Sequence, residues 1–427
     1  MKVIKYPKIQ NWETLTKRPV ISSEKLDSIV SDILINVKQN KDKALLEYSN
    51  KFDGVKLSNI AITDEDISTA ILKVSENLKK AISLAKTNIT KFHSAQRETS
   101  EVIETTPGVK CWRKSLPIEK VGLYIPGGTA PLFSTILMLG IPAVLAGCKE
   151  IVLCSPPDKN GNIHPAILYT ANLIGIKKIF KIGGAQAIAA MAYGTESVPQ
   201  VYKIFGPGNQ YVTKAKELVQ LNGVAIDMPA GPSEVLVIAD KTSKPEFIAS
   251  DLLSQAEHGA DSQVILVSDN EDIINETMKE ITVQLANLPR VEIATKALKN
   301  SSAFLLETIN DCIDFSNMYA PEHLILASED TDDWLNQITN AGSVFIGNYS
   351  CESAGDYASG TNHTLPTNGC ARNYSGVSLD SFVKKVTFQK LSKEGIQNIG
   401  PAIELMAEAE ELFAHKNAVT LRLKSNV

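Results

Sequence analysis

Apolar residues recur along the chain with two different periods, and the change of period divides the sequence. In Ser22–Gly54 and Thr63–Gln96 they lie three or four residues apart, as Ile29 and Ile33 do, and this spacing predicts helices. From Val121 onward, short runs that are almost wholly apolar alternate with helical stretches. Such runs are typical of strands buried on both faces of a parallel sheet. The pattern therefore predicts an α/β fold made of repeated strand–helix units.

Two successive groups of these units follow one another. The first group has four units, whose strands are VGLYIP, IVLCSP, KIFKIGG and VYKIFGPG. The second group, from Val224 to about Asn348, has the strand-like runs VAIDM, EVLVIA, SQVILVS, HLILAS and SVFIGN. The helices between the strands are long enough for the crossovers of a doubly wound sheet. We expect an arm at residues 1–20, helices with a cofactor domain at 21–224, a catalytic domain at 225–380 and a tail at 381–427.

The end of the chain has a different pattern. Pro401–His415 predicts an amphipathic helix, and in the following NAVTLRL the residues Val419, Leu421 and Leu423 alternate with polar ones, which predicts a strand. One helix and one strand cannot enclose a core of their own. We therefore expect the tail to pack on another surface, with a second subunit as the candidate.

Composition argues against several classes of function. The 427 residues carry a net charge of -5 and no block of Lys and Arg, so no nucleic-acid surface is expected. Leu132–Ala146 is the longest apolar run and is too short to span a membrane. The N-terminus lacks the apolar core of a signal peptide. With six scattered cysteines and no CxxC pair, we expect reduced thiols in the cytoplasm.

Side chains that could carry chemistry gather in a few stretches. A helix predicted between Ser243 and Gly259 carries Gln255 and His258 near its end, three residues apart and so on one face. Three strands of the first group end in Gly-rich loops, IPGG, KIGGAQ and FGPGN, whose N–H groups are suited to a bound ligand, although tight turns alone explain the glycines equally well. G-x-G-x-x-G and H-E-x-x-H are both absent. These patterns alone indicate a soluble α/β enzyme and leave metal binding open.

Several blocks of the sequence resemble those of histidinol dehydrogenases, in the same order. They are VGLYIPGG, GGAQAIAA, FGPGNQYVTKAK, GPSEVLVIAD, DLLSQAEHG, PEHL, ESAGDYASGTNHTLP and AHKNAVTLRL. The resemblance implies two incomplete Rossmann-like domains, similar to those of aldehyde dehydrogenases, in a homodimer. It also implies oxidation of L-histidinol to L-histidine with two NAD⁺, through the aldehyde, as the last step of histidine biosynthesis.

The same resemblance implies the residues of the site. One zinc ion per subunit is expected, and the implied ligands are Gln255, His258, Asp356 and His415, the last of them acting on the partner subunit's site. Glu322 and His323 resemble the acid–base pair, for which the neutral-range pKa of histidine is suited. The implied substrate contacts are Ser233, Gln255, His258, His323, Asp356, Glu410 and His415. The implied NAD contacts are Tyr124, Gln186 and Asn209, each in or beside one of the Gly-rich loops.

Three other functions remain open at this point. The substrate of the same fold and metal could be another small amino or sulfo alcohol, and Glu410 is the residue that would favour a cationic one. In a zinc hydrolase, Glu322 would activate water, but the three Gly-turn units would be unexplained. In a structural metal protein, the pair Glu322–His323 would have no purpose. A thiol mechanism of the aldehyde-dehydrogenase kind is not expected, because no cysteine lies between Ser243 and Gly259.

Overall fold

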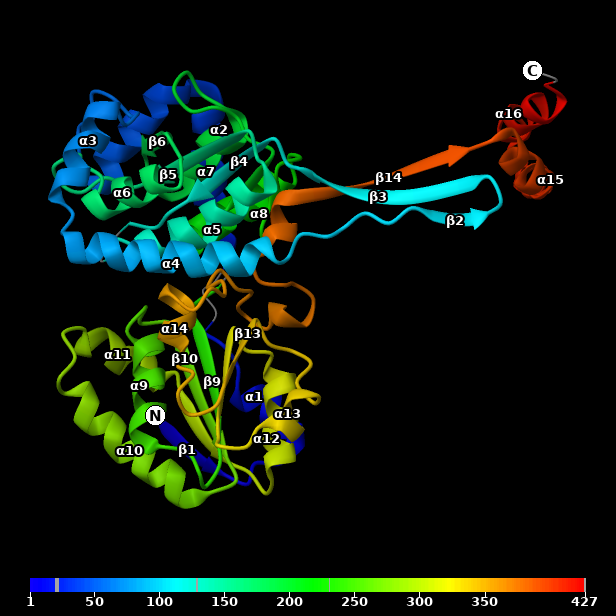
Figure 1. The fold of residues 1–427 in the computed structure, drawn as a ribbon. Helices are drawn as coiled ribbons and strands as arrows, with labels where there is room; N and C mark the ends of the chain where they lie inside the picture. The colour runs from blue at the N-terminus through cyan, green and yellow to red at the C-terminus, as the bar shows by residue number, and fades with distance from the viewer. Residues whose placement is uncertain (20–22, 128–129, 230, 426–427) are drawn as a thin grey trace.

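The computed structural model describes residues 1–19, 23–127, 130–229 and 231–425, and it contains two parallel-sheet domains and a projecting arm (Figure 1). Gly128, which ends the Gly-rich loop IPGG, lies outside the described residues, as do Thr129 and Ala230. The first domain is built on a parallel sheet of order β6-β5-β4-β7-β8. Its strands are β4 (Lys120–Tyr124), β5 (Glu150–Ser155), β6 (Lys178–Lys181), β7 (Lys203–Phe205) and β8 (Ala225–Ile226).

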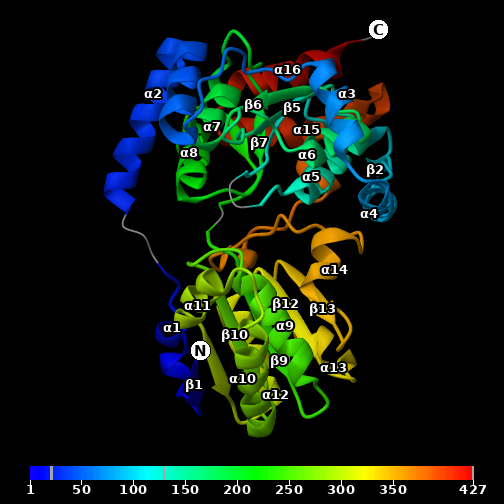
Figure 2. The same ribbon diagram turned by 90° about the vertical axis from the view of Figure 1, so that its left-hand side faces the viewer.

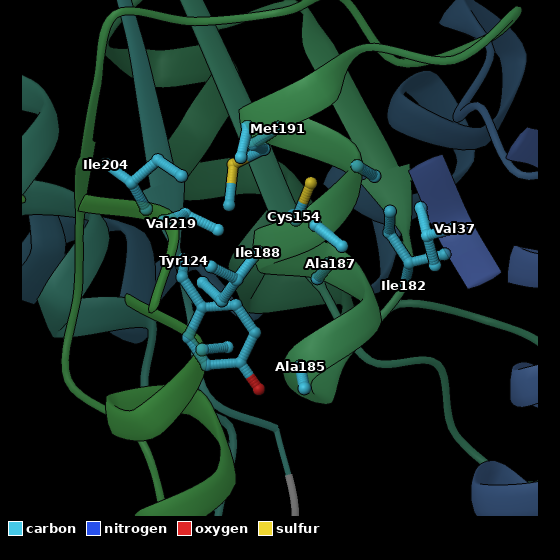
Figure 3. Close-up of a cluster of buried hydrophobic side chains, with 14 of the residues drawn as sticks. Val37, Tyr124, Cys154, Ile182, Ala185, Ala187, Ile188, Met191, Ile204 and Val219 are labelled. Atoms are coloured by element: carbon cyan, nitrogen blue, oxygen red, sulfur yellow. The ribbon is translucent and has the colours of Figure 1, made fainter. Parts of the chain in front are cut away.

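Helices cover both faces of this first sheet, as the alternating pattern predicted. One face is packed by α2 (Ser23–Tyr48), α7 (Gly184–Tyr193) and α8 (Gln210–Gln220). The other is packed by α3 (Asp64–Lys73), α4 (Glu76–Ser94), α5 (Phe133–Ala146) and α6 (Pro165–Leu173). A one-turn π-helix (Ser49–Asp53) follows α2. Figure 3 shows the core on the first face, where the ring of Tyr124 lies against Ile188 beside Cys154 and Met191. The helices α2, α3 and α4, which the sequence placed before the first strand–helix unit, therefore belong to the first domain.

The second domain has a six-stranded parallel sheet of order β1-β11-β10-β9-β12-β13. Its strands are β1 (Lys2–Lys5), β9 (Glu234–Ala239), β10 (Gln263–Ser268), β11 (Ser302–Leu305), β12 (His323–Ala327) and β13 (Ser343–Ile346). On one face lie α9 (Pro245–Ala256), α10 (Glu271–Leu285) and α11 (Val291–Lys299). The other face is covered by a short 3-10 turn (Ile9–Asn11), α1 (Trp12–Leu15), α12 (Ile309–Tyr319) and α13 (Asp332–Leu335). The buried central strands β9, β10 and β12 carry the site described below.

Two assignments differ from the sequence-based expectation. The first residues do not form a separate arm, because β1 pairs with β11 at the edge of the second sheet and Trp12 is buried in its core (Figure 2). The run VAIDM does not begin the second domain, because β8 pairs with β7 in the first sheet. The pattern indicated a strand for VAIDM but not for residues 2–5, and in neither case did it show which sheet the segment would join.

An antiparallel sheet, which the sequence analysis did not predict, projects from the first domain (Figure 1). It consists of β2 (Ile103–Thr106), β3 (Val109–Pro117) and β14 (Val383–Leu391), and β14 pairs with β3 over its whole length. A 3-10 turn (Leu379–Phe382) precedes β14, and the ring of Phe382 stacks on Phe205 with 4.0 Å between centroids. This stacking anchors the base of the arm to the first domain.

The tail at the far end of this arm is a pair of helices, α15 (Lys393–Ala409) and α16 (Phe413–Lys424). The predicted strand NAVTLRL was wrong: it lies within α16. In a helix, Val419 and Leu423 share one face, where Val419 is buried and Leu423 lies close to Gly400 of α15. Leu421 points elsewhere and is exposed. Within the described ranges of the chain, no helix combines the length and apolar character needed to cross a membrane.

Candidate active site

The predicted acid–base pair lies at the start of β12, in the middle of the second sheet. Glu322 directly precedes the strand and His323 is its first residue, paired with Val235 of β9. Both side chains are buried, with exposed fractions of 6% and 3%. Because the strand is held on both sides by neighbours, the two side chains have fixed positions inside the domain.

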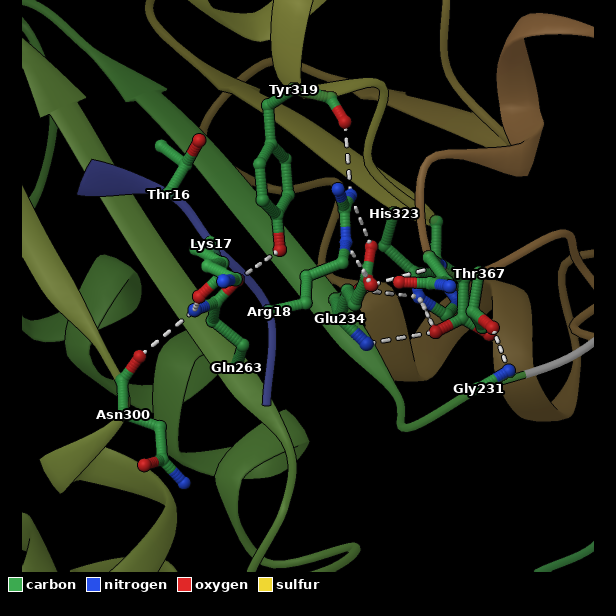
Figure 4. Close-up of polar contacts among 12 residues, drawn as sticks. Thr16, Lys17, Arg18, Gly231, Glu234, Gln263, Asn300, Tyr319, His323 and Thr367 are labelled. Carbon is green, nitrogen blue, oxygen red and sulfur yellow. Dashed lines mark hydrogen bonds and ion pairs between the residues drawn. The ribbon is translucent and has the colours of Figure 1, made fainter. Parts of the chain in front are cut away.

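The main chain of Glu234, the first residue of β9, binds three of the predicted site residues (Figure 4). Its N–H donates to Oε2 of Glu322 at 2.9 Å. Its carbonyl oxygen accepts from Nε2 of Gln255 at 3.1 Å and lies 3.2 Å from Nδ1 of His323. Gln255 comes from the last turn of α9, so one strand end holds side chains from α9 and β12 together.

The short helix α14 (Glu352–Tyr357) brings Asp356 to the same place. Oδ1 of Asp356 lies 3.7 Å from Nε2 of His323. One ligand atom each from His258, Glu352 and Asp356 fall within 4.8 Å of one another. His258 is not in the helix as predicted, because α9 ends at Ala256 and His258 follows in a turn, its N–H donating to the carbonyl of Gln255.

Glu352 was missed by the sequence analysis, although it is almost completely buried. The signal was present in the block ESAGDYASGTNHTLP, where Glu352 stands four residues before Asp356. In a helix this spacing puts two carboxylates on one face. That relationship was not recognised, because α14 is a helix of only six residues and is too short for a helical period to stand out in the sequence.

The donor atoms of this cluster fit a divalent metal ion. Four of its buried polar atoms have no hydrogen-bond partner among the described residues: Oε1 of Gln255, Nε2 of His323, Oε2 of Glu352 and Oδ1 of Asp356. Buried polar groups are normally satisfied, so unsatisfied atoms at one place need an explanation. Carboxylate and amide oxygens with imidazole nitrogens are ligands that zinc accepts. A cation bound among the three oxygens would satisfy them and would leave Nε2 of His323 free to face a substrate.

Burial and mutual charge shift the ionisation of the buried pair. Burial raises the pKa of Glu322 to about 8. Burial alone would lower the pKa of His323, but the surrounding carboxylates, Glu352 and Glu322 first, raise it to about 10. For Asp356, burial opposes ionisation, yet contact with His323 and the other imidazoles holds its pKa below the usual value. Of these three groups, Glu322 is therefore the one whose pKa lies nearest to neutral pH.

Two further residues, the predicted Ser233 and also His363, adjoin this cluster. Ser233 is half-buried and directly precedes Glu234. His363, in the loop after α14, has Nδ1 3.0 Å from the carbonyl oxygen of Asp356 and Nε2 3.1 Å from Oγ1 of Thr135 in the first domain. This loop therefore spans the two domains beside the site.

Glu410 and His415 are not brought to the cluster within a single chain. Both are exposed, and they lie at the helical end of the projecting arm, whereas α14 and β9 lie in the second domain (Figure 1). Glu410 is the residue that ends α15, and His415 is in the first turn of α16. On one continuous helix, two side chains five residues apart would face different directions. The chain bends between α15 and α16, so this constraint does not apply to Glu410 and His415.

The three predicted NAD contacts lie beyond the carboxyl ends of strands in the first sheet. Tyr124 ends β4, and its hydroxyl oxygen accepts from the N–H of Gly184 at 3.1 Å. Gln186 is buried in the first turn of α7. Asn209 caps α8, with Oδ1 accepting from the N–H of Tyr211 at 3.0 Å. Ligands of doubly wound sheets bind at this edge.

The loop that carries Asn209 is fixed by its glycine and by a buried ion pair. Gly206 has a φ of 134°, and a Cβ there would overlap the carbonyl oxygen of Tyr124. Its N–H donates to Asp227 at 2.8 Å and its carbonyl accepts from Nζ of Lys216 at 2.9 Å. Lys216 and Asp227 also form a buried ion pair with each other. The backbone of this loop is therefore held close to β4.

Comparisons with known proteins bear on these observations. A family model for histidinol dehydrogenase matches residues 16–423. The chain is 60% identical over 425 residues to the histidinol dehydrogenase of Bacteroides thetaiotaomicron, covering 100% of this chain and 99% of that protein. It is 58% identical over 424 residues to that of Bacteroides fragilis strain YCH46, with 99% of each chain covered.

Solved structures give the same result. The crystal structure of histidinol dehydrogenase from Elizabethkingia anophelis superposes with a TM-score of 0.97 at 63% identity, over 99% of this chain and 98% of that chain. An apo betaine aldehyde dehydrogenase from Staphylococcus aureus superposes with a TM-score of 0.50 at 11% identity, over 89% of this chain and 85% of that chain, which concerns the fold alone. The predicted aldehyde-dehydrogenase-like α/β fold is confirmed. The chain belongs to the histidinol dehydrogenases, the oxidoreductases of histidine biosynthesis.

Proposed function

We propose that this enzyme oxidises L-histidinol to L-histidine in two NAD⁺-linked steps, with one zinc ion per subunit. The observation that carries the proposal is the buried convergence of Gln255, His323, Glu352 and Asp356, each with a polar atom that has no partner among the described residues. Family membership supports the substrate, and the donor set supports the metal. His258 completes the group on the exposed side, and the reaction is proposed to take place in the cytoplasm.

In the proposed first step, the alcohol loses its hydroxyl proton while a hydride leaves its carbon. His323 is placed to take that proton at Nε2. Its Nδ1 faces the carbonyl oxygen of Glu234, which only accepts, so Nδ1 keeps its own proton and the ring is held in one orientation. When bound, NAD⁺ accepts the hydride and zinc polarises the substrate oxygen. A cation bound among the carboxylates would offset the charge that raises the pKa of His323, and would thereby favour the neutral ring that accepts a proton at Nε2.

In the proposed second step, water adds to the aldehyde and a second hydride leaves the hydrated carbon. Glu322 is suited to take the proton of that water. Its Oε2 is fixed by the N–H of Glu234, and burial raises its pKa to about 8, which makes it a stronger base than an exposed carboxylate. The overall reaction consumes one L-histidinol, two NAD⁺ and one water, and yields L-histidine, two NADH and three protons.

The proposal includes a homodimer in which the tail completes the partner's site. The arm carries Glu410 and His415 away from the cluster of their own subunit (Figure 1). Large apolar side chains at its end are exposed in the single chain: Leu405, Met406, Leu412, Phe413 and Leu421. Such a surface is typical of an interface between subunits. His415 would add a ligand, and Glu410 would face the cationic substrate.

A single titration of product tests the proposal. Purified protein loaded with zinc is incubated with limiting L-histidinol and excess NAD⁺, and NADH is measured by absorbance. We expect two NADH for each L-histidinol, and no NADH from metal-depleted protein. One NADH per substrate would limit the enzyme to the first step, and no NADH at all would refute the proposal. Hydrolysis of an amide without NAD⁺ would favour the hydrolase instead.

A further inference from the structure

The chain passes between its two domains three times, and one side-chain pair lies where the three passages meet. The first passage lies between α1 and α2, the second between β8 and β9, and the third between α14 and Val377, which packs in the core of the first domain. Arg18 is in the first passage, and Glu234 directly follows the second. The third passage contains Asn368, ahead of a short 3-10 turn (Cys370–Arg372).

Arg18 and Glu234 form a two-pronged ion pair (Figure 4). Nε of Arg18 lies 2.5 Å from Oε1 of Glu234, and Nη2 lies 2.8 Å from Oε2. The same Nη2 donates to the carbonyl oxygen of Tyr319 at 2.9 Å, and the guanidinium lies 3.9 Å above the Tyr319 ring. Oε1 of Glu234 also accepts from the N–H of Asn368 at 2.9 Å. One carboxylate thus joins all three passages.

Glu234 also connects this junction to the site. Its main-chain N–H and carbonyl hold Glu322, Gln255 and His323, while its side chain, only 2% exposed, is occupied by Arg18 and Asn368. A planar guanidinium bound at two points fixes an orientation, which a lysine cannot do with its single point charge. Buried ion pairs contribute little net stability on average, so positioning is the better account of this pair.

We propose that Arg18 is a positioning residue, which pins the three passages to Glu234 and thereby fixes the first domain, with its cofactor site, relative to the buried acid–base pair. This inference rests on the proposed function, because hydride transfer must cross from the substrate in one domain to the nicotinamide in the other. Transfer requires the reacting atoms to lie about 3–3.5 Å apart, and a displacement of about 1 Å costs roughly 100-fold in rate.

The positioning role of Arg18 is tested with Arg18→Lys in the full-length, zinc-loaded enzyme. We expect kcat to fall by about 10- to 100-fold, because the domains are held less closely. Zinc content and the Kd for NAD⁺ should stay within about twofold, because Arg18 contacts Glu234 and Tyr319, which are neither proposed zinc ligands nor NAD contacts. The deuterium isotope effect with L-histidinol dideuterated at the carbinol carbon should rise, because hydride transfer becomes slower relative to the other steps.

Arg372→Lys is the matched control. Arg372 lies in the third passage and donates to the carbonyl of Met318, but it does not contact Glu234. We expect its kcat and isotope effect to match those of the wild type. If Arg18→Lys does not fold, Arg18→Met/Glu234→Leu removes both charges and leaves neither unpaired, and the same measurements apply.

The results separate the possible explanations. A variant at Arg18 that keeps wild-type kcat and isotope effect, with only a lower Tm, overturns the inference and leaves a structural role. Loss of zinc or of NAD⁺ binding also overturns it, because the change would then act inside one site. Failure of the wild type to form NADH from L-histidinol would refute the proposed function itself. The inference about Arg18, which rests on that function, would then be refuted with it.

Discussion

Gln255 and His323 contact the same carbonyl oxygen, that of Glu234, at 3.1 Å and 3.2 Å. A carbonyl accepts hydrogen bonds only, so the amide turns its NH₂ group and the imidazole its Nδ1–H toward it. The opposite atoms, Oε1 of the amide and Nε2 of the ring, are therefore directed away from it, and neither has a hydrogen-bond partner among the described residues. One main-chain atom thus orients a proposed metal ligand and a proposed base.

The proposed ligands and the proposed base should respond differently to substitution. We expect His258→Asn and Asp356→Ala to lose most of their zinc, because each removes a donor atom from the cluster. His323→Asn should keep its zinc and lose about 10²- to 10⁴-fold in kcat, the usual contribution of a positioned acid or base. Elemental analysis of each purified variant measures the metal. Full zinc content in the first two variants would refute the ligand assignment.

Activity of mixed dimers would show whether the tail acts on the partner subunit. His415→Ala and His323→Asn subunits are each expected to be nearly inactive alone. A mixed dimer has one site in which both residues are wild type, if His415 serves the partner's site, and should recover part of the wild-type activity. The two subunits are denatured, mixed and refolded, and differently tagged dimers are isolated before assay. Isolated mixed dimers without activity would place His415 outside the partner's site.

Glu410 should matter for the substrate rather than for the metal. We expect Glu410→Gln to raise the KM for L-histidinol by about 10-fold or more, because an uncompensated cationic substrate loses on the order of 1.4 kcal/mol or more of binding. Zinc content should be unchanged. Glu408→Gln is a suitable control, because Glu408 is an exposed carboxylate of the same helix, paired with Lys416. Equal KM values for the two variants would contradict the role of Glu410.

The loop that carries Asn209 should tolerate no side chain at Gly206. We expect Gly206→Ala to cost on the order of 1–3 kcal/mol in stability, because its φ of 134° is strained for alanine and its Cβ would overlap the Tyr124 carbonyl. The Kd for NAD⁺ should rise as the loop shifts. Gly223→Ala provides the comparison, since Gly223 has a φ of 90° but open space around a Cβ. Isothermal titration calorimetry with NAD⁺ measures the Kd of both variants. An unchanged Kd in Gly206→Ala would count against a cofactor role for this loop.

Burial of Asp251 should make the stability of the second domain depend on pH. Burial raises the pKa of Asp251 from 3.8 to about 7. Between about pH 4 and pH 7 the carboxyl of Asp251 is ionised in the unfolded chain but still protonated in the folded one. The free energy of unfolding therefore falls as the pH rises through this range, by on the order of 1.4 kcal/mol per pH unit. Asp251→Asn cannot ionise, and its advantage in urea midpoint over the wild type should be larger at pH 8 than at pH 5. Metal-depleted protein is used, with the exposed Asp333→Asn as control. An advantage that does not change with pH would contradict this account.

The sequence predicted the two parallel sheets well, because buried parallel strands have an unmistakable run of apolar residues, as in EVLVIA for β9. It did not reveal β14, whose residues are exposed or half-buried on both faces, so that no alternation marks the strand. The family resemblance implied that Gln255 and Asp356 belong to one site, and in the structure each lies beside His323. The contacts that Glu234 makes with Glu322, Gln255 and His323 could not be inferred, because they depend on main-chain atoms. The role of Arg18 depends on contacts between distant segments, which local composition does not show. Glu352 could have been found from its spacing to Asp356, had the short helix been recognised.

The pairing of β1 with β11 has a consequence for the newly made protein. Lys2 faces Ser302 in the sheet, so translation completes the first strand long before its neighbour exists. The nascent chain can assemble the first domain while residues 2–5 remain unpaired. The second sheet can form completely only when most of the polypeptide has left the ribosome. A fusion tag attached before Met1 would therefore lie against the second domain, although the helices that follow it in the sequence belong to the first domain.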